Sequence, residues 1–178
     1  MHAPVMTDSG KRVLAWPRAA GASGFTLTEL MITLGVLGIL VAAALPALGN
    51  LVRGQRVKAA TSDIFASLVY ARSEAIKRAV DVDLVPTAAD WATGWRVRVQ
   101  ATNVNLKVQD AIGGVAVALA PAGTLTYGRD GRLSGTVANF TVSVSGDNSI
   151  TARCIRLDPS GRPNIKVDTN GNPADGCN

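Results

Sequence analysis

Residues 24–48 read GFTLTELMITLGVLGILVAAALPAL, and this stretch dominates the hydropathy pattern of the chain. The 19 residues from 30 to 48 contain no charged side chain. As a helix they would extend about 28 Å, close to the thickness of the hydrocarbon core of a bilayer. Because the run is apolar on every face, it favours a membrane-spanning helix over a buried core helix. Glu29 stands one turn inside this helix, where a carboxylate is costly and indicates a function.

The residues before the apolar run are polar and basic. Lys11, Arg12 and Arg18 oppose one acid, Asp8, which gives residues 1–24 a net charge of +2. Basic residues before the first apolar segment favour a cytoplasmic N-terminus. A standard secretory signal is the alternative, and the small residues 42–44 could supply its cleavage site, although such signals have shorter apolar stretches.

The motif Gly24-Phe25-Thr26-Leu27-Thr28-Glu29-Leu30 resembles the class III signal of type IV pilins and type II secretion pseudopilins. The resemblance implies that prepilin peptidase cleaves between Gly24 and Phe25 and N-methylates Phe25. Glu29 would then be the fifth residue of the processed chain and would pair with the terminal amine of a neighbouring pilin. Pro46 stands where many members carry a proline. A buried carboxylate and a buried ammonium are each expensive alone and tolerable as a pair.

The helical pattern continues beyond Pro46 but becomes amphipathic over residues 52–79. Apolar or small side chains recur at steps of three or four, and Ser67 and Glu74 lie off this stripe. We therefore expect one helix from about residue 25 to 79, with residues 25–51 as its membrane and assembly half and a weak point near Pro46 and Gly49. The stripe consists of Val57, Thr61, Ile64, Leu68, Ala71, Ala75 and Ala79, widened by Phe65 and Ile76.

Alternation with a period of two replaces the helical period after Val80. Five segments show it, at residues 80–84, 95–99, 115–119, 140–144 and 154–157, and turn sequences such as Gly113-Gly114 separate them. Short alternating segments with such breaks predict antiparallel strands. Residues 80–178 are therefore expected to form a β-rich domain, and the fold class is α+β, with a long N-terminal helix packed on antiparallel sheet.

The helix-then-strand layout and the segment RCIRLDPSGR at residues 153–162 resemble the GspH/FimT family of minor pilins and pseudopilins. The resemblance implies a structural subunit of a type IV pilus, or alternatively a minor pseudopilin of the type II secretion system. It also implies an inner-membrane protein with one span and a periplasmic C-terminal domain. The expected partners are other pilins, prepilin peptidase and the inner membrane, with no small-molecule substrate.

Four cations lie within 14 residues near the C-terminus and face one acid, Asp158. A patch of this kind can bind phosphates without regard to sequence. It resembles the Gly-Arg-x-Arg turn with which some FimT-like pilins bind double-stranded DNA in natural transformation, except that Asn164 replaces the second arginine. A solvated strand end is the alternative. The candidate DNA-binding residues are Arg153, Arg156, Arg162 and Lys166.

Cys154 and Cys177 are the two cysteines, and in an oxidising periplasm a disulfide between them is expected. The only histidine is His2, which argues against a His-based triad or a multi-His zinc site. The polar residues 168–175 do not fit an EF-hand loop. We therefore expect no enzyme activity, no cofactor and no metal.

Overall fold

The computed structural model describes residues 24–170 and 172, with the side chain of Pro46 left undescribed. One helix, α1 (Leu27–Arg78), extends past Pro46, as the sequence predicts, and it is not interrupted at the weak point expected near Pro46 and Gly49. The chain divides into two units at Val41 and Ala42, within this helix. In the first unit the described side chains are exposed throughout, including Phe25 at 81%.

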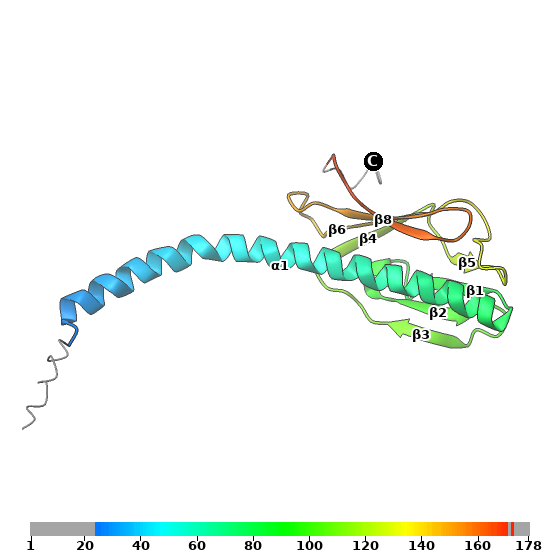
Figure 1. The fold of residues 1–178 in the computed structure, drawn as a ribbon, viewed down its shortest axis with the longest axis horizontal. Helices are drawn as coiled ribbons and strands as arrows, with labels where there is room; N and C mark the ends of the chain where they lie inside the picture. The colour runs from blue at the N-terminus through cyan, green and yellow to red at the C-terminus, as the bar shows by residue number, and fades with distance from the viewer. Residues whose placement is uncertain (1–23, 171, 173–178) are drawn as a thin grey trace, which may run out of the picture. The chain divides into compact units, whose positions relative to one another are not determined.

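The second unit contains two antiparallel sheets of four strands each (Figure 1). The strands are β1 (Val82–Pro86), β2 (Trp95–Val99), β3 (Asn105–Gln109), β4 (Val115–Ala120), β5 (Leu125–Tyr127), β6 (Asn139–Val144), β7 (Arg153–Leu157) and β8 (Pro163–Val167). A short 3-10 helix, η1 (Trp91–Thr93), lies between β1 and β2. Sheet A has the order β3-β2-β1-β5 and sheet B the order β4-β6-β7-β8, so the fold class is α+β as predicted.

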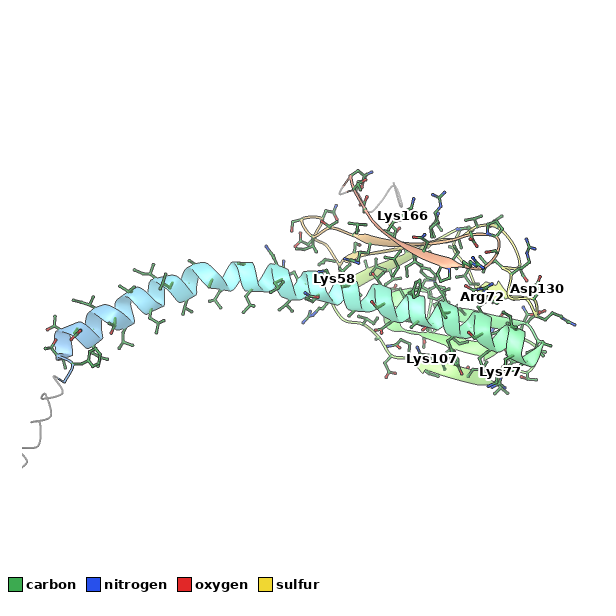
Figure 2. The ribbon with its side chains drawn as sticks, viewed as in Figure 1. Lys58, Arg72, Lys77, Lys107, Asp130 and Lys166 are labelled. Carbon is green, nitrogen blue, oxygen red and sulfur yellow. The ribbon has the colours of Figure 1, made fainter. Side chains whose placement is uncertain are left out.

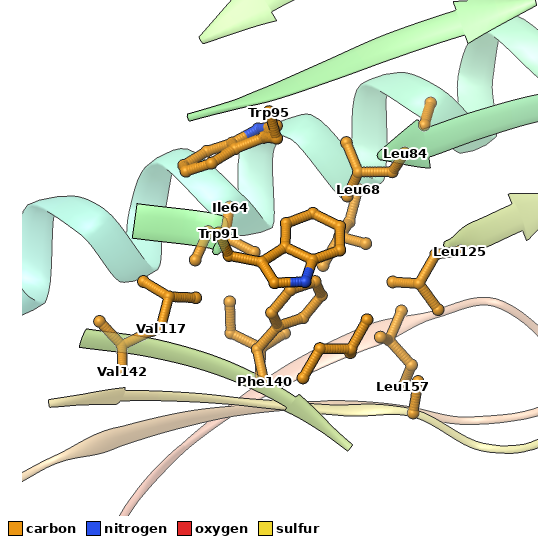
Figure 3. Close-up of a cluster of buried hydrophobic side chains, with 14 of the residues drawn as sticks. Ile64, Leu68, Leu84, Trp91, Trp95, Val117, Leu125, Phe140, Val142 and Leu157 are labelled. Carbon is orange, nitrogen blue, oxygen red and sulfur yellow. The ribbon is translucent and has the colours of Figure 1, made fainter. Parts of the chain in front are cut away.

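The amphipathic half of α1 supplies one wall of the hydrophobic core. Ile64 and Leu68 are fully buried, and in Figure 3 they lie beside Trp91 and Phe140. The Trp91 and Phe140 rings meet edge to face with centroids 4.8 Å apart, a favoured aromatic geometry. The buried helical side chains are Val57, Ala60, Thr61, Ile64, Ser67, Leu68, Ala71, Glu74 and Ala75.

The predicted buried face of α1 differs from the observed one in two ways, because two of its residues are exposed and two polar residues that the sequence places outside it are buried. Ala79 is exposed because it lies beyond the end of the helix at Arg78, and Ile76 is 50% exposed although its neighbour Ala75 is fully buried. Ser67, placed off the stripe by the sequence, is fully buried and accepts a hydrogen bond of 2.9 Å from the Trp95 indole nitrogen. Glu74 is buried beside Arg78, with which it forms an ion pair.

Candidate functional site

The hairpin of β7 and β8 carries the predicted cationic segment. Its turn, residues 158–162, is organised by the Asp158 carboxylate, which accepts hydrogen bonds from the Ser160 hydroxyl at 2.6 Å and the Arg162 backbone N–H at 3.0 Å. These two donors, with the Ser160 hydroxyl the larger influence, hold the pKa of Asp158 below its ordinary value. Asp158, the one acid of the cationic segment, therefore stabilises the turn through both of these hydrogen bonds.

Gly161 fixes where this turn lies. Its φ is +76°, a conformation that favours glycine. A Cβ there would collide with the Gly131 carbonyl oxygen and would lie 2.8 Å from the Tyr127 ring. The buried Tyr127 hydroxyl donates a hydrogen bond of 3.2 Å to the Gly161 carbonyl oxygen, and burial raises the pKa of this phenol. The turn is thereby held against the end of sheet A.

Three of the four predicted cations border one hollow of about 350 Å³. Asn164 pairs with Arg156 in the strand register, and Lys166 stands two residues beyond Asn164 on the same face. Arg162 comes from the turn and lines the same hollow. Within the described residues, Asp158 is the only acid that lines it. The arrangement presents three positive charges to an anion.

Arg153 does not join this group. It differs from Arg156 by three positions along β7, and an odd separation puts two side chains on opposite faces of a strand. Arg153 instead lines a second hollow, of about 300 Å³, together with Lys58 of α1. Lys58 was not among the predicted site residues, because it stands nearly one hundred residues away in the sequence.

The predicted disulfide falls partly outside the described residues. Cys154 is fully buried and is not a free thiol. Cys177 lies outside the described part of the chain. The pairing of these two cysteines therefore stays a prediction.

At the N-terminal end, Gly24 and Phe25 precede the helix and Glu29 lies in its first turn. The Thr26 hydroxyl accepts a hydrogen bond of 3.2 Å from the Glu29 backbone N–H, so Thr26 is the N-cap of α1. The pair has the Thr-x-x-Glu spacing of a capping box. We did not predict this role of Thr26 from the sequence, although the spacing was visible there. Among the described residues, α1 is long and apolar enough to cross a membrane.

A long helix with an exposed apolar N-terminal part, continued into two antiparallel sheets, defines a pilin-like subunit. Residues 60–161 match the family model described as Type II transport protein GspH. Residues 20–45 match the Prokaryotic N-terminal methylation motif. The chain belongs to the GspH family, a family of structural filament subunits rather than enzymes. Membership implies assembly with other pilins, and the methylation motif implies processing by prepilin peptidase.

Two solved structures have the same fold, both of the type IV minor pilin FimU from Pseudomonas aeruginosa (strain PAO1), in different crystal forms. One is 22% identical with a TM-score of 0.58 and covers 70% of this chain and 96% of its own. The other is 23% identical with a TM-score of 0.56 and covers 68% and 99%. A search of curated proteins returns no significant match.

Proposed function

We propose that the chain is a minor pilin of a type IV pilus. It inserts in the inner membrane as a single-pass protein with residues 1–24 in the cytoplasm and residues 80–178 in the periplasm. Prepilin peptidase cleaves between Gly24 and Phe25 and methylates Phe25. The methylation motif and the charge-free run of residues 30–48 support this order of events.

After cleavage, residues 25–51 leave the bilayer for a bundle formed by the equivalent helices of other pilins. The exposed apolar side chains of this part of α1 support the proposal, because they require either lipid or neighbouring helices. Glu29 pairs with the terminal amine of a neighbouring subunit, which makes the burial of both charges tolerable.

The β-domain binds double-stranded DNA through Arg156, Arg162 and Lys166. The observation that carries this proposal is that all three border one hollow in which the only acid among the described residues, Asp158, accepts hydrogen bonds within its own turn. Arginine and lysine at such a surface neutralise phosphates, and guanidinium also forms paired hydrogen bonds to phosphate oxygens. DNA captured in this way would be held without sequence preference, because contacts to phosphates carry no sequence information.

The test is a titration of a labelled 30-base-pair duplex with the full-length chain in detergent micelles at several salt concentrations. Arg162→Gln and Lys166→Gln are each expected to lower the salt slope by about one, since each removes one phosphate contact. Lys77→Gln, at an exposed lysine of α1 that lines neither hollow, is the matched control and should leave the slope unchanged. Arg153→Gln should also leave it unchanged, because Arg153 lines the other hollow. Unchanged affinity in both Arg162→Gln and Lys166→Gln would exclude this hollow as the DNA site.

A second candidate is a minor pseudopilin of the type II secretion system, which the description of the matching family model favours. Deleting the gene distinguishes the two functions. If the chain is a minor pilin, the deletion is expected to reduce surface pili and transformation while protein secretion continues. Loss of secretion with intact pili would favour the pseudopilin.

A further inference from the structure

Strand β8 is the last strand of sheet B, and the described residues place no strand beyond it. Its pairing with β7 is regular over five residue pairs, from Arg153 with Val167 to Leu157 with Pro163. An edge strand of this kind carries unpaired backbone groups that can receive a strand from another chain.

Two backbone hydrogen bonds at the ends of the hairpin show which backbone N–H and C=O groups of β8 do not bond to β7. The Asp158 N–H donates to the Arg162 carbonyl at 3.3 Å, and the Asp168 N–H donates to the Ala152 carbonyl at 3.1 Å. Hydrogen-bonded and non-hydrogen-bonded pairs alternate in an antiparallel ladder. Counting inward from either bond gives the same result, in which Ile165 and Val167 direct their N–H and C=O groups away from β7.

The side chains of the same two residues are also uncovered, Ile165 at 37% and Val167 at 48% exposure. Pro163 has no N–H to offer on the open side, so a docked strand would pair from Ile165 onward. Edge strand β3 of sheet A differs, because the register shifts between Val97 and Arg98 of its neighbour β2, and a bulge of that kind blunts an edge.

The two hollows described above flank β8, one on each of its faces. Val167 lines the hollow that contains Lys58 and Arg153, whereas Lys166 lines the hollow that contains Arg156. Figure 2 shows Lys58 on α1 and Lys166 on β8. Successive side chains of a strand added to this edge would point alternately toward the two hollows. Main-chain hydrogen bonds with pockets for alternate side chains are the means by which sheet edges recognise peptides.

The charges of the hollows determine which strand fits. No described acid lines the hollow of Lys58 and Arg153, and in the other hollow Asp158 accepts hydrogen bonds from its own turn. We propose that the open edge of β8 receives an extended segment of another protein as an added strand, with carboxylates directed into the two hollows. This proposal does not depend on DNA binding, and it assigns to Lys58 and Arg153 a role that the DNA site leaves unused.

The probes for the test are two labelled octapeptides, TVEVTEVT and TVKVTKVT, titrated against the full-length chain in detergent micelles. We expect the glutamate peptide to bind at least about tenfold more tightly than the lysine peptide, because cations outnumber acids in both hollows: Lys58 and Arg153 face no described acid, and Arg156, Arg162 and Lys166 face Asp158 alone. Lys58→Gln and Arg153→Gln should each weaken the glutamate peptide. Equal binding of the two peptides would overturn the proposal.

The backbone contribution is tested by Ile165→Pro and Val167→Pro against the matched controls Ile165→Ala and Val167→Ala. Proline removes an N–H that β7 does not use, and we expect each proline variant to weaken binding by about threefold to tenfold. The alanine variants keep the N–H and should bind better than the proline variants. Proline variants that bind as tightly as the alanine variants would overturn the added-strand geometry.

A measurement on the unmodified protein guards against proline variants that fail to fold. Bound glutamate peptide should slow amide hydrogen exchange at Ile165 and Val167. Binding without this protection would overturn strand addition. If the chain binds the 30-base-pair duplex but neither peptide, strand addition is also overturned, and DNA binding remains the only proposed role of the cations.

Discussion

The Tyr127 hydroxyl donates a hydrogen bond to the carbonyl oxygen of Gly161, which joins the last residue of β5 to the turn between β7 and β8. Sheet A and sheet B are therefore connected at this point by a buried polar contact as well as by the apolar core. Tyr127→Phe leaves a carbonyl without its donor, and we expect it to lower the free energy of unfolding by about 1–3 kcal/mol. Urea denaturation of the full-length chain in micelles measures this. Tyr70→Phe, at a half-buried tyrosine of α1, is the control and should cost less.

Gly161→Ala tests the close approach of the turn to sheet A. The methyl group would meet the Gly131 carbonyl and the Tyr127 ring in addition to the strain of a positive φ. Gly146 has nearly the same φ, +73° against +76°, and apart from its two chain neighbours no other residue has an atom within 4 Å of the point that an added methyl group would occupy. Gly146→Ala should therefore cost about 1–2 kcal/mol of backbone strain, and Gly161→Ala clearly more. Equal melting temperatures for the two variants would contradict the steric explanation.

The turn should also respond to acid. The pKa of Asp158 is lowered chiefly by the Ser160 hydroxyl, and that of Asp147 chiefly by Ser149. A carboxyl group whose folded pKa is depressed contributes stability above its unfolded pKa, and this contribution is lost as the pH falls through the folded pKa. The ordinary pKa of both carboxyl groups is 3.8. We therefore expect the melting temperature to decrease as the pH is lowered from 3.8. Asp158→Asn should make this decrease of the melting temperature at low pH smaller. A decrease as large as that of the unmodified chain would show that Asp158 does not contribute to it.

Ser67 joins α1 to sheet A through its hydroxyl oxygen. That oxygen accepts hydrogen bonds from the Trp95 indole at 2.9 Å and the Lys107 ammonium at 3.2 Å, while the hydroxyl donates to the Asp63 carbonyl. Ser67→Ala leaves the buried indole N–H unpaired and should cost about 1–3 kcal/mol in urea denaturation. Ser73→Ala removes an exposed serine that bonds only to its own helix, and should change stability by less than about 0.5 kcal/mol.

Glu29 occupies the capping position beside Thr26, and under the proposed function its negative charge also guides assembly. Glutamine also suits this position of a capping box, so Glu29→Gln keeps the local structure and removes the charge. We expect both Glu29→Gln and Glu29→Ala to be processed normally but to fail to join the filament. Immunoblots of sheared filaments and of membranes measure the two steps. Normal assembly of Glu29→Gln would show that the charge is dispensable.

The long helix and five of the eight strands were predictable because apolar side chains recur along each of them with a regular period, even though β1 buries both of its faces. β3, β5 and β8 were not predicted: β5 has three residues, and the alternation in β3 and β8 rests on few apolar side chains, Leu106 and Val108 in β3 and Ile165 and Val167 in β8. The grouping of Arg153 with Arg156 rested on proximity in sequence. The period of a strand separates them, and that separation could have been predicted once β7 was recognised.

Gly131 gives the β7–β8 turn a mechanical connection to the helix. Its carbonyl oxygen lies against Gly161 and accepts a hydrogen bond of 2.9 Å from the Arg72 side chain of α1. Among the described strands β8 pairs only with β7, and its turn also bonds to Tyr127 of sheet A. A ligand that pulls on this turn would therefore load sheet A through the Tyr127 hydroxyl and α1 through the Gly131 carbonyl and Arg72, so that part of the tension reaches the helix directly.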